Sequence, residues 1–233
     1  MQVPFFYIAH IADAGLPVQL DEDTSKHVVQ VLRMQNGELL NLTDGKGNIY
    51  SCVITDNHRK KCMLQVKEKT TVEPSAKKIS IAISPVKNNT RFEWFLEKAT
   101  EIGVSSIVPL ICERTEKQQV KPERMQQIII SAMLQSRQCW MPQLKEPVKF
   151  SAFVKENIEG SKLIAHCDDQ HKNPLSAYQP HKQSTILIGP EGDFSPKEIE
   201  EALANGFAGV SLGNTRLRTE TAGMVAAVLL CIS

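Results

Sequence analysis

Residues 186–206 read ILIGPEGDFSPKEIEEALANG, and their pattern sets the architecture expected around them. The apolar run at the start is typical of a buried strand, and the two glycines that follow permit a tight turn. Ser195, Pro196 and Glu198 then suit the N-cap, the first position and the third position of a helix with a capping box. The stretch therefore predicts a strand, a turn and a helix in succession, the repeating unit of a parallel α/β sheet.

The same alternation extends over the rest of the chain from residue 79. Short β-rich apolar runs stand at 81–86, 105–111, 162–167, 185–189 and 209–213, with helical patterns between most of them. In the helix expected at 90–103, Thr90 and Glu93 form a capping box and Gly103 supplies the stop. We therefore expect residues 73–233 to form an α/β domain with a mostly parallel sheet covered by helices.

Residues 1–72 show short alternating runs instead. The glycine-rich turn at 44–47 lies between two such runs and is a hairpin signal. Only the segment SKHVVQVLR at 25–33 has a helical pattern, and its apolar face comprises Val28, Val31 and Leu32. We expect a small β-rich barrel in this part of the chain, with a linker at 72–78.

The composition of the 233-residue chain is that of an ordinary globular protein, with 42% apolar and 23% charged residues. No apolar run approaches the roughly 18 to 20 residues needed to cross a bilayer, so we expect a cytoplasmic protein with no membrane partner. The six cysteines form no CxxC pair, and HCDDQH at 166–171 has the spacing of no standard metal site. We therefore expect no metal.

Charge is distributed unevenly along the chain. Residues 76–150 hold twelve Lys or Arg against seven Glu and no Asp, which indicates a basic face for a polyanion; solvated lysines without a partner are the alternative. The turn at 189–193 instead carries Glu191 and Asp193, with no Lys or Arg before Lys197. Because carboxylates repel phosphate, this turn suits a neutral or cationic ligand held by backbone groups.

A second polar turn, SLGNTRLRTE at 211–220, follows the last expected strand. Thr219 is placed to cap the final helix, and Glu220 suits its first turn, where the helix dipole favours an anion. Arg216 and Arg218 have no such structural explanation and indicate a functional site. Ligands of open α/β sheets bind at the carboxyl ends of strands, which is where both turns lie. The P-loop and dinucleotide fingerprints are absent from the sequence.

The two turns together resemble the signature pair of the RsmE family of ribosomal RNA methyltransferases, members of the SPOUT superfamily. The resemblance covers essentially the whole chain. It rests on GPEGDFSPKE at 189–198, SLGNTRLRTETA at 211–222, SKHVVQVLR at 25–33, TDGKGNIY at 43–50, EKATEIGVSSIVPLICERT at 97–115 and SAMLQSRQ at 131–138. The linked order of so many motifs makes the resemblance specific.

The resemblance implies methylation of uridine N3 in 16S ribosomal RNA, with S-adenosylmethionine as donor. It also implies a PUA-like barrel in residues 1–72, a SPOUT domain in 73–233 with a deep trefoil knot within roughly 163–233, and a homodimer. The positive sulfonium of the donor explains an acidic turn. The implied cofactor residues are His166, Ile188, Gly189, Pro190, Glu191, Gly192, Ser211, Leu212, Gly213, Leu217 and Arg218.

Uridine N3 must lose its proton during the reaction. We expect Arg218 to stabilise negative charge on the uracil and Glu220 to accept the proton, and the reaction requires no metal. RNA contacts are expected from His27, Arg33, Lys87, Arg91, Arg114 and Arg137.

Two positions depart from the family pattern: Asp193 stands where GPEGGF has a glycine, and Thr215-Arg216 stands where an Arg–Ile pair is common. A SPOUT enzyme with a different ribosomal or transfer RNA target remains an alternative. So does a cofactor-free RNA-binding protein of ribosome assembly.

Overall fold

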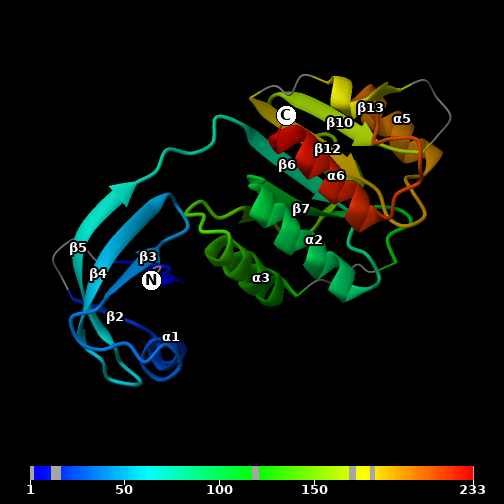
Figure 1. Ribbon diagram of the computed structural model, residues 1–233. Coiled ribbons are helices and arrows are strands. Elements are labelled where there is room, and N and C mark those ends of the chain that lie inside the picture. The colour runs from blue at the N-terminus through cyan, green and yellow to red at the C-terminus, as the bar shows by residue number, and fades with distance from the viewer. Residues whose placement is uncertain (1–2, 12–16, 117–120, 168–171, 179–181, 233) are drawn as a thin grey trace. The chain divides into compact units, whose positions relative to one another are not determined.

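The chain divides into two units, each with its own sheet (Figure 1). The computed structural model describes residues 3–11, 17–116, 121–167, 172–178 and 182–232. The first unit comprises Met1–Pro74 together with Met133–Met141, and the second comprises Ser75–Ala132 and Pro142–Ser233. The first unit is therefore not one continuous stretch of chain.

The first unit contains a five-stranded sheet in the order β1-β3-β4-β5-β2. Its strands are β1 (Phe5–Tyr7), β2 (Pro17–Gln19), β3 (Leu39–Thr43), β4 (Asn48–Asp56) and β5 (Met63–Thr71). The predicted hairpin is confirmed, because β3 and β4 pair antiparallel across the turn at 44–47. Leu40, Leu42, Cys52 and Leu64 have no exposed surface and form the centre of the core of this unit.

The turn of this hairpin binds a later segment of the chain. The backbone N–H of Gly47 donates to the carbonyl oxygen of Cys139 at 2.8 Å, and that of Met141 donates to Gly45 at 2.9 Å. The indole N–H of Trp140 donates to the carbonyl oxygen of Val72 at 2.9 Å. These three bonds explain why residues 133–141 belong to the first unit.

The predicted helical segment forms two short helices, α1 (Glu22–Lys26) and the π-helix η1 (His27–Val31). Its expected apolar face is wrong in part: Val28 is buried, whereas Val31 is 65% and Leu32 is 42% exposed. The i→i+5 bonding of a π-helix takes up an extra residue per turn. Later residues are therefore rotated away from the face that 3.6-residue spacing predicts.

The second unit contains a sheet in the order β11-β13-β10-β12-β6-β7-β8, with β9 paired to β7. Its strands are β6 (Lys78–Ile83), β7 (Ser106–Ile111), β8 (Gln143–Leu144), β9 (Val148–Lys149), β10 (Ser161–Ala165), β11 (Asn173–Pro174), β12 (Gln183–Ile188) and β13 (Ala208–Ser211). Every pairing among the described strands of this sheet is parallel, which confirms the α/β expectation.

Helices cover both faces of this sheet, because its central strands carry apolar side chains on both sides. The helices are α2 (Asn89–Ile102), α3 (Pro122–Gln135), α4 (Phe150–Phe153), the 3-10 helix η2 (Leu175–Ala177), α5 (Pro196–Ala204) and α6 (Thr219–Cys231). α2 and α6 lie side by side on one face (Figure 1). Phe150 of α4 and Ile199 of α5 pack on the opposite face, around Ala82 and Leu187.

The helix α2 begins differently from the prediction. Asn88 is its N-cap and accepts a hydrogen bond from the backbone N–H of Thr90, so the predicted Thr90–Glu93 capping box is wrong. Glu93 pairs instead with Arg124, at 3.0 Å. The predicted stop is confirmed, since Gly103 is the C-cap in a left-handed conformation. Among the described residues, no helix is long and apolar enough to cross a membrane.

Candidate functional site

The turn after β12 is built as its sequence predicts. The Ser195 hydroxyl accepts a hydrogen bond from the Glu198 backbone N–H at 3.4 Å, and the Glu198 carboxylate accepts one from the Ser195 N–H at 2.9 Å. This capping box starts α5 and commits the Ser195 hydroxyl to a structural role. Ahead of it, the N–H of Asp193 donates to the carbonyl oxygen of Pro190 at 2.9 Å and closes the turn.

Gly189, at the end of β12, is enclosed by its neighbours. A Cβ at this position would lie 3.1 Å from the Phe194 ring, closer than ordinary van der Waals contact. The Thr219 hydroxyl donates to the carbonyl oxygen of Gly189 at 3.0 Å. The expectation that Thr219 caps α6 is therefore wrong: Arg218 is the N-cap and makes no side-chain capping bond. Thr219 instead ties the final helix to the end of the strand.

A cavity of about 430 Å³ opens at the carboxyl ends of β10, β12 and β13, beside the start of α6. Nine of the expected cofactor residues line it: His166, Ile188, Gly189, Pro190, Glu191, Ser211, Leu212, Gly213 and Leu217. They come from three segments that parallel pairing of β10 with β12 and β13 brings to one edge of the sheet. This edge is where open α/β sheets bind ligands.

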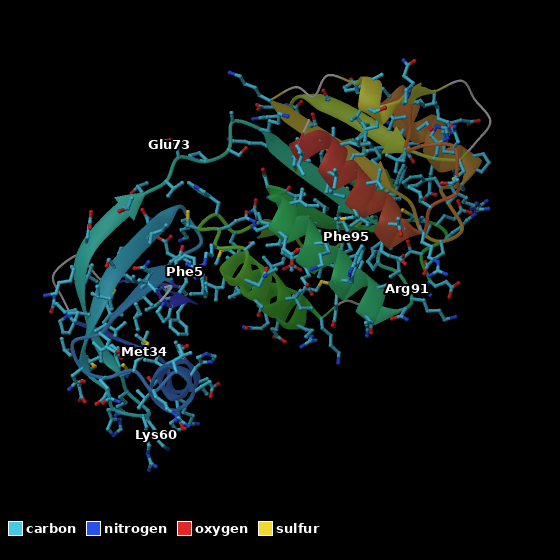
Figure 2. The ribbon with its side chains drawn as sticks, viewed as in Figure 1. Phe5, Met34, Lys60, Glu73, Arg91 and Phe95 are labelled. Atoms are coloured by element: carbon cyan, nitrogen blue, oxygen red, sulfur yellow. The ribbon has the colours of Figure 1, made fainter. Side chains whose placement is uncertain are left out.

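Three expected site residues are not among the described residues that line the cavity. Gly192 lies in the turn, where Arg114 packs on it. Arg218 is exposed at the N-cap of α6. Glu220 is only 6% exposed, and its Oε1 lies 3.8 Å from Nε of Arg91. Arg91 belongs to the first turn of α2 (Figure 2). Oε2 of Glu220 is buried without a hydrogen-bond partner among the described residues.

The cavity also contains charged residues outside the expected cofactor set. Lys172 and Arg216 line it together with Glu191 and Asp193, so the site is mixed in charge and not simply acidic. Lys172 also donates from Nζ to the carbonyl oxygen of His166 at 2.6 Å. The sequence indicated Arg216 as a functional residue, because it directly follows the motif SLGNT. Lys172 had none, because its neighbours match no pattern.

The two carboxylates of the turn also hold the backbone around it. Asp193 accepts the N–H of Cys167 through Oδ2 and the N–H of Phe194 through Oδ1, both at 2.8 Å. Glu191 accepts the N–H of Lys87 at 3.3 Å. Asp193 has a φ of 62°, a left-handed conformation that glycine adopts more easily. Its two hydrogen bonds stabilise the side chain at this strained position.

Cys167 is the exposed thiol of the cavity. Burial of the sulfur raises its pKa above the ordinary cysteine value, and the charge of Asp193 raises it further, against the opposing effects of Arg216 and Lys172. The thiol therefore stays protonated at neutral pH and is a poor nucleophile. No group of three metal-ligating side chains occurs among the described residues, and positions 168–171 of HCDDQH lie outside them.

The expected RNA-binding residues are distributed over both units. His27, Arg33 and Arg137 are exposed in the first unit, where the His27 ring lies edge-on to Phe6 at 5.7 Å. In the second unit, Lys87 pairs with Glu116 at 3.0 Å, and Arg91 lies beside Glu220. Arg114 donates to backbone carbonyls of the turn and is therefore not a free surface cation.

Comparisons with known proteins agree with this architecture. The RNA methyltransferase domain family matches residues 73–231, and the RNA methyltransferase PUA domain family matches residues 20–67. The ribosomal RNA small subunit methyltransferase E of Synechocystis is 32% identical over 208 residues, which cover 86% of this chain and 68% of that protein. The fold and the matched domains thus define an RNA methyltransferase with an N-terminal PUA domain.

Solved structures show the same relationship. A probable rRNA-methyltransferase from Porphyromonas gingivalis superposes with a TM-score of 0.90 at 40% identity, covering 97% of this chain and 95% of that one. The ribosomal RNA small subunit methyltransferase E of Neisseria gonorrhoeae, bound to S-adenosyl methionine, has a TM-score of 0.87 at 29% identity and covers 97% and 96%. The chain belongs to the ribosomal RNA small subunit methyltransferase E family.

Proposed function

We propose that this chain transfers a methyl group from S-adenosylmethionine to N3 of a specific uridine in 16S ribosomal RNA. The observation that carries the proposal is the cavity at the ends of β10, β12 and β13, where segments that match both family signatures meet. Its volume of about 430 Å³ lies within the range of small-molecule sites. When bound there, S-adenosylmethionine supplies the methyl group.

The residues of the cavity fit this donor. Glu191 and Asp193 place negative charge near a ligand with a positive sulfonium, while Lys172 and Arg216 offer partners for its carboxylate. The turns at 189–191 and 211–213 also line the cavity, and because their glycines permit close approach to the backbone, they would hold the adenosine part of the ligand. We assign cofactor binding to these residues together with His166, Leu217 and the turn residue Gly192.

The reaction further requires a proton acceptor and a charge to stabilise the uracil anion. We propose Arg218 for the charge, because it is exposed at the N-cap of α6, next to the cavity residues Leu217 and Thr219. We propose Glu220 as the acceptor. Glu220 directly follows the cavity residue Thr219, and its Oε2 has no hydrogen-bond partner among the described residues. No step requires a metal.

RNA binding is assigned to exposed cations of both units, and we propose a cytoplasmic enzyme because ribosomal RNA is its substrate. We further propose a homodimer formed through α6 and its C-cap residue Ile232. Met224, Val228 and Ile232 are spaced four residues apart; the first two are partly exposed and Ile232 is 69% exposed. The barrel at 1–72, the catalytic domain at 73–233 and the knot within 163–233 stay predictions of the resemblance.

The deciding experiment is nucleoside mass analysis of 16S RNA from a strain that lacks this gene. Loss of N3-methyluridine, restored by the gene in trans, is expected. An unchanged amount of N3-methyluridine in the deletion strain would contradict the proposal and favour a different RNA target. Calorimetry with S-adenosylmethionine distinguishes a methyltransferase from a cofactor-free assembly protein. A heat of binding is expected for the first and none for the second.

A further inference from the structure

The side chain of Arg114 holds the turn that follows β12. Arg114 lies in the turn after β7, and its Nη1 donates to the carbonyl oxygen of Gly192 at 2.7 Å and to that of Phe194 at 3.4 Å. A Cβ on Gly192 would lie 3.4 Å from Cδ of Arg114, so the aliphatic part of the arginine also packs directly on the turn. One guanidinium thus contacts the backbone at two residues of the segment between β12 and α5.

The backbone of Arg114 is itself fixed on both sides. The N–H of Glu113 donates to Oε1 of Glu198 at 2.8 Å, which ties the preceding residue to α5. The following residue, Thr115, is buried, and its hydroxyl accepts the N–H of Cys112 and shares a hydrogen bond with the Ser84 hydroxyl, both at 2.8 Å. The exposed side chain of Arg114 therefore extends from a rigid backbone support.

The turn lies between Arg114 and the ligand cavity. Gly192 contacts Arg114, whereas its neighbours Glu191 and Asp193 line the cavity. Moving the Gly192 peptide would therefore displace both carboxylates. A guanidinium suits this place because its Nη1 donates to both carbonyl oxygens while its charge compensates the adjacent acidic residues.

We propose that Arg114 is a positioning residue for the cofactor loop: it holds residues 190–194 in the conformation that binds S-adenosylmethionine. This inference rests on the proposed cofactor site. It replaces the expected role of Arg114 as an RNA phosphate contact, because its guanidinium is committed to the protein backbone.

The test compares the full-length wild type with Arg114→Ala, Arg114→Lys and the control Lys197→Ala. Lys197 is an exposed cation on the first turn of α5, so its removal changes the charge near the same loop without breaking these bonds. Calorimetry measures the Kd for S-adenosylmethionine, filter binding measures the Kd for 16S RNA, and steady-state kinetics separate KM from kcat.

We expect Arg114→Ala to raise the Kd and KM for S-adenosylmethionine about tenfold, the scale of one charged hydrogen bond. We expect kcat at saturating cofactor, RNA affinity and the thermal midpoint of the ligand-free protein to change little. Arg114→Lys should recover part of the loss, because an ammonium reaches one carbonyl, and Lys197→Ala should match the wild type.

Four results would overturn the inference. If Arg114→Ala lost RNA affinity and kept its cofactor affinity, Arg114 would be an RNA contact. If the variant had both a lower kcat and a lower thermal midpoint, the role of Arg114 would be only to stabilise the fold. Unchanged cofactor affinity in Arg114→Ala would defeat this inference alone. A wild type that binds no S-adenosylmethionine would defeat the proposed cofactor site and this inference together.

Discussion

Oε1 of Glu220 lies 3.8 Å from Nε of Arg91, and Oε2 of the same buried carboxylate has no hydrogen-bond partner among the described residues. The pair joins the start of α6 to α2 on the face of α6 that does not line the cavity. A buried oxygen without a donor is costly, and a catalytic role is one of the explanations for such a group in a folded protein. Glu220 is therefore the carboxylate to test as the proton acceptor.

We expect Glu220→Gln to lower kcat by about 100-fold, the usual contribution of a general base. The Kd for S-adenosylmethionine should stay within about twofold, because Glu220 does not line the cavity and a charge-to-amide change of this kind keeps the shape of the side chain. Steady-state kinetics and calorimetry measure the two effects, with Glu97→Gln, a half-exposed carboxylate of α2 that pairs with Lys98, as control. An unchanged kcat would exclude Glu220 as the base.

Arg33 and Arg137 have left-handed backbones, each with a φ of 57°, where glycine is less strained by about 1 kcal/mol. We expect Arg137→Gly to keep or raise the free energy of unfolding and to weaken RNA binding severalfold, with a salt dependence reduced by about one counterion. Urea unfolding and salt titrations measure both effects. Arg137→Ala is the control that removes the charge without relieving the strain.

The same pair of measurements applies to Arg33→Gly. Either arginine would lose its proposed RNA role if the glycine variant bound 16S RNA as tightly as the wild type at every salt concentration. Cofactor affinity should not change in either variant, because both residues belong to the first unit and the cavity lies in the second.

Thr219→Val should remove the hydrogen bond to Gly189 while preserving the volume of the side chain. The Gly189 carbonyl then loses its donor in a buried place, so we expect a loss of about 1 to 2 kcal/mol in the free energy of unfolding. Thr219→Ser keeps the hydroxyl and should lose much less. Equal unfolding midpoints of the valine and serine variants in urea would show that the bond contributes nothing.

The raised pKa of Cys167 predicts slow alkylation at pH 8, faster as the pH rises, because only the thiolate reacts. Asp193→Asn removes a charge that raises this pKa, so the pKa should fall and the rate at fixed pH should increase. Peptide mass mapping after timed exposure to iodoacetamide measures the rate at Cys167. Slower alkylation in the asparagine variant would contradict the proposed electrostatic effect.

Local patterns were predictable because neighbouring residues carry them. The capping box of Ser195 and Glu198, the hairpin turn at 44–47 and the C-cap at Gly103 each depend on the chemistry of a few adjacent side chains. The predicted N-caps were wrong where more than one nearby residue could occupy the capping position of a helix. Asn88 displaced Thr90 as the cap of α2, and Thr219 bonds across to β12 in place of capping its own helix.

The sequence by itself determined the α/β class, the family and nine of the residues that line the cavity. These follow from periodicity, turn chemistry and linked motifs, which are encoded locally. Only the tertiary structure decided that Arg114 holds the cofactor loop, that Lys172 enters the cavity and that Glu220 faces Arg91. The residues in these contacts come from different segments of the chain. The segments meet because the sheet places their strands side by side in the order β10-β12-β6-β7.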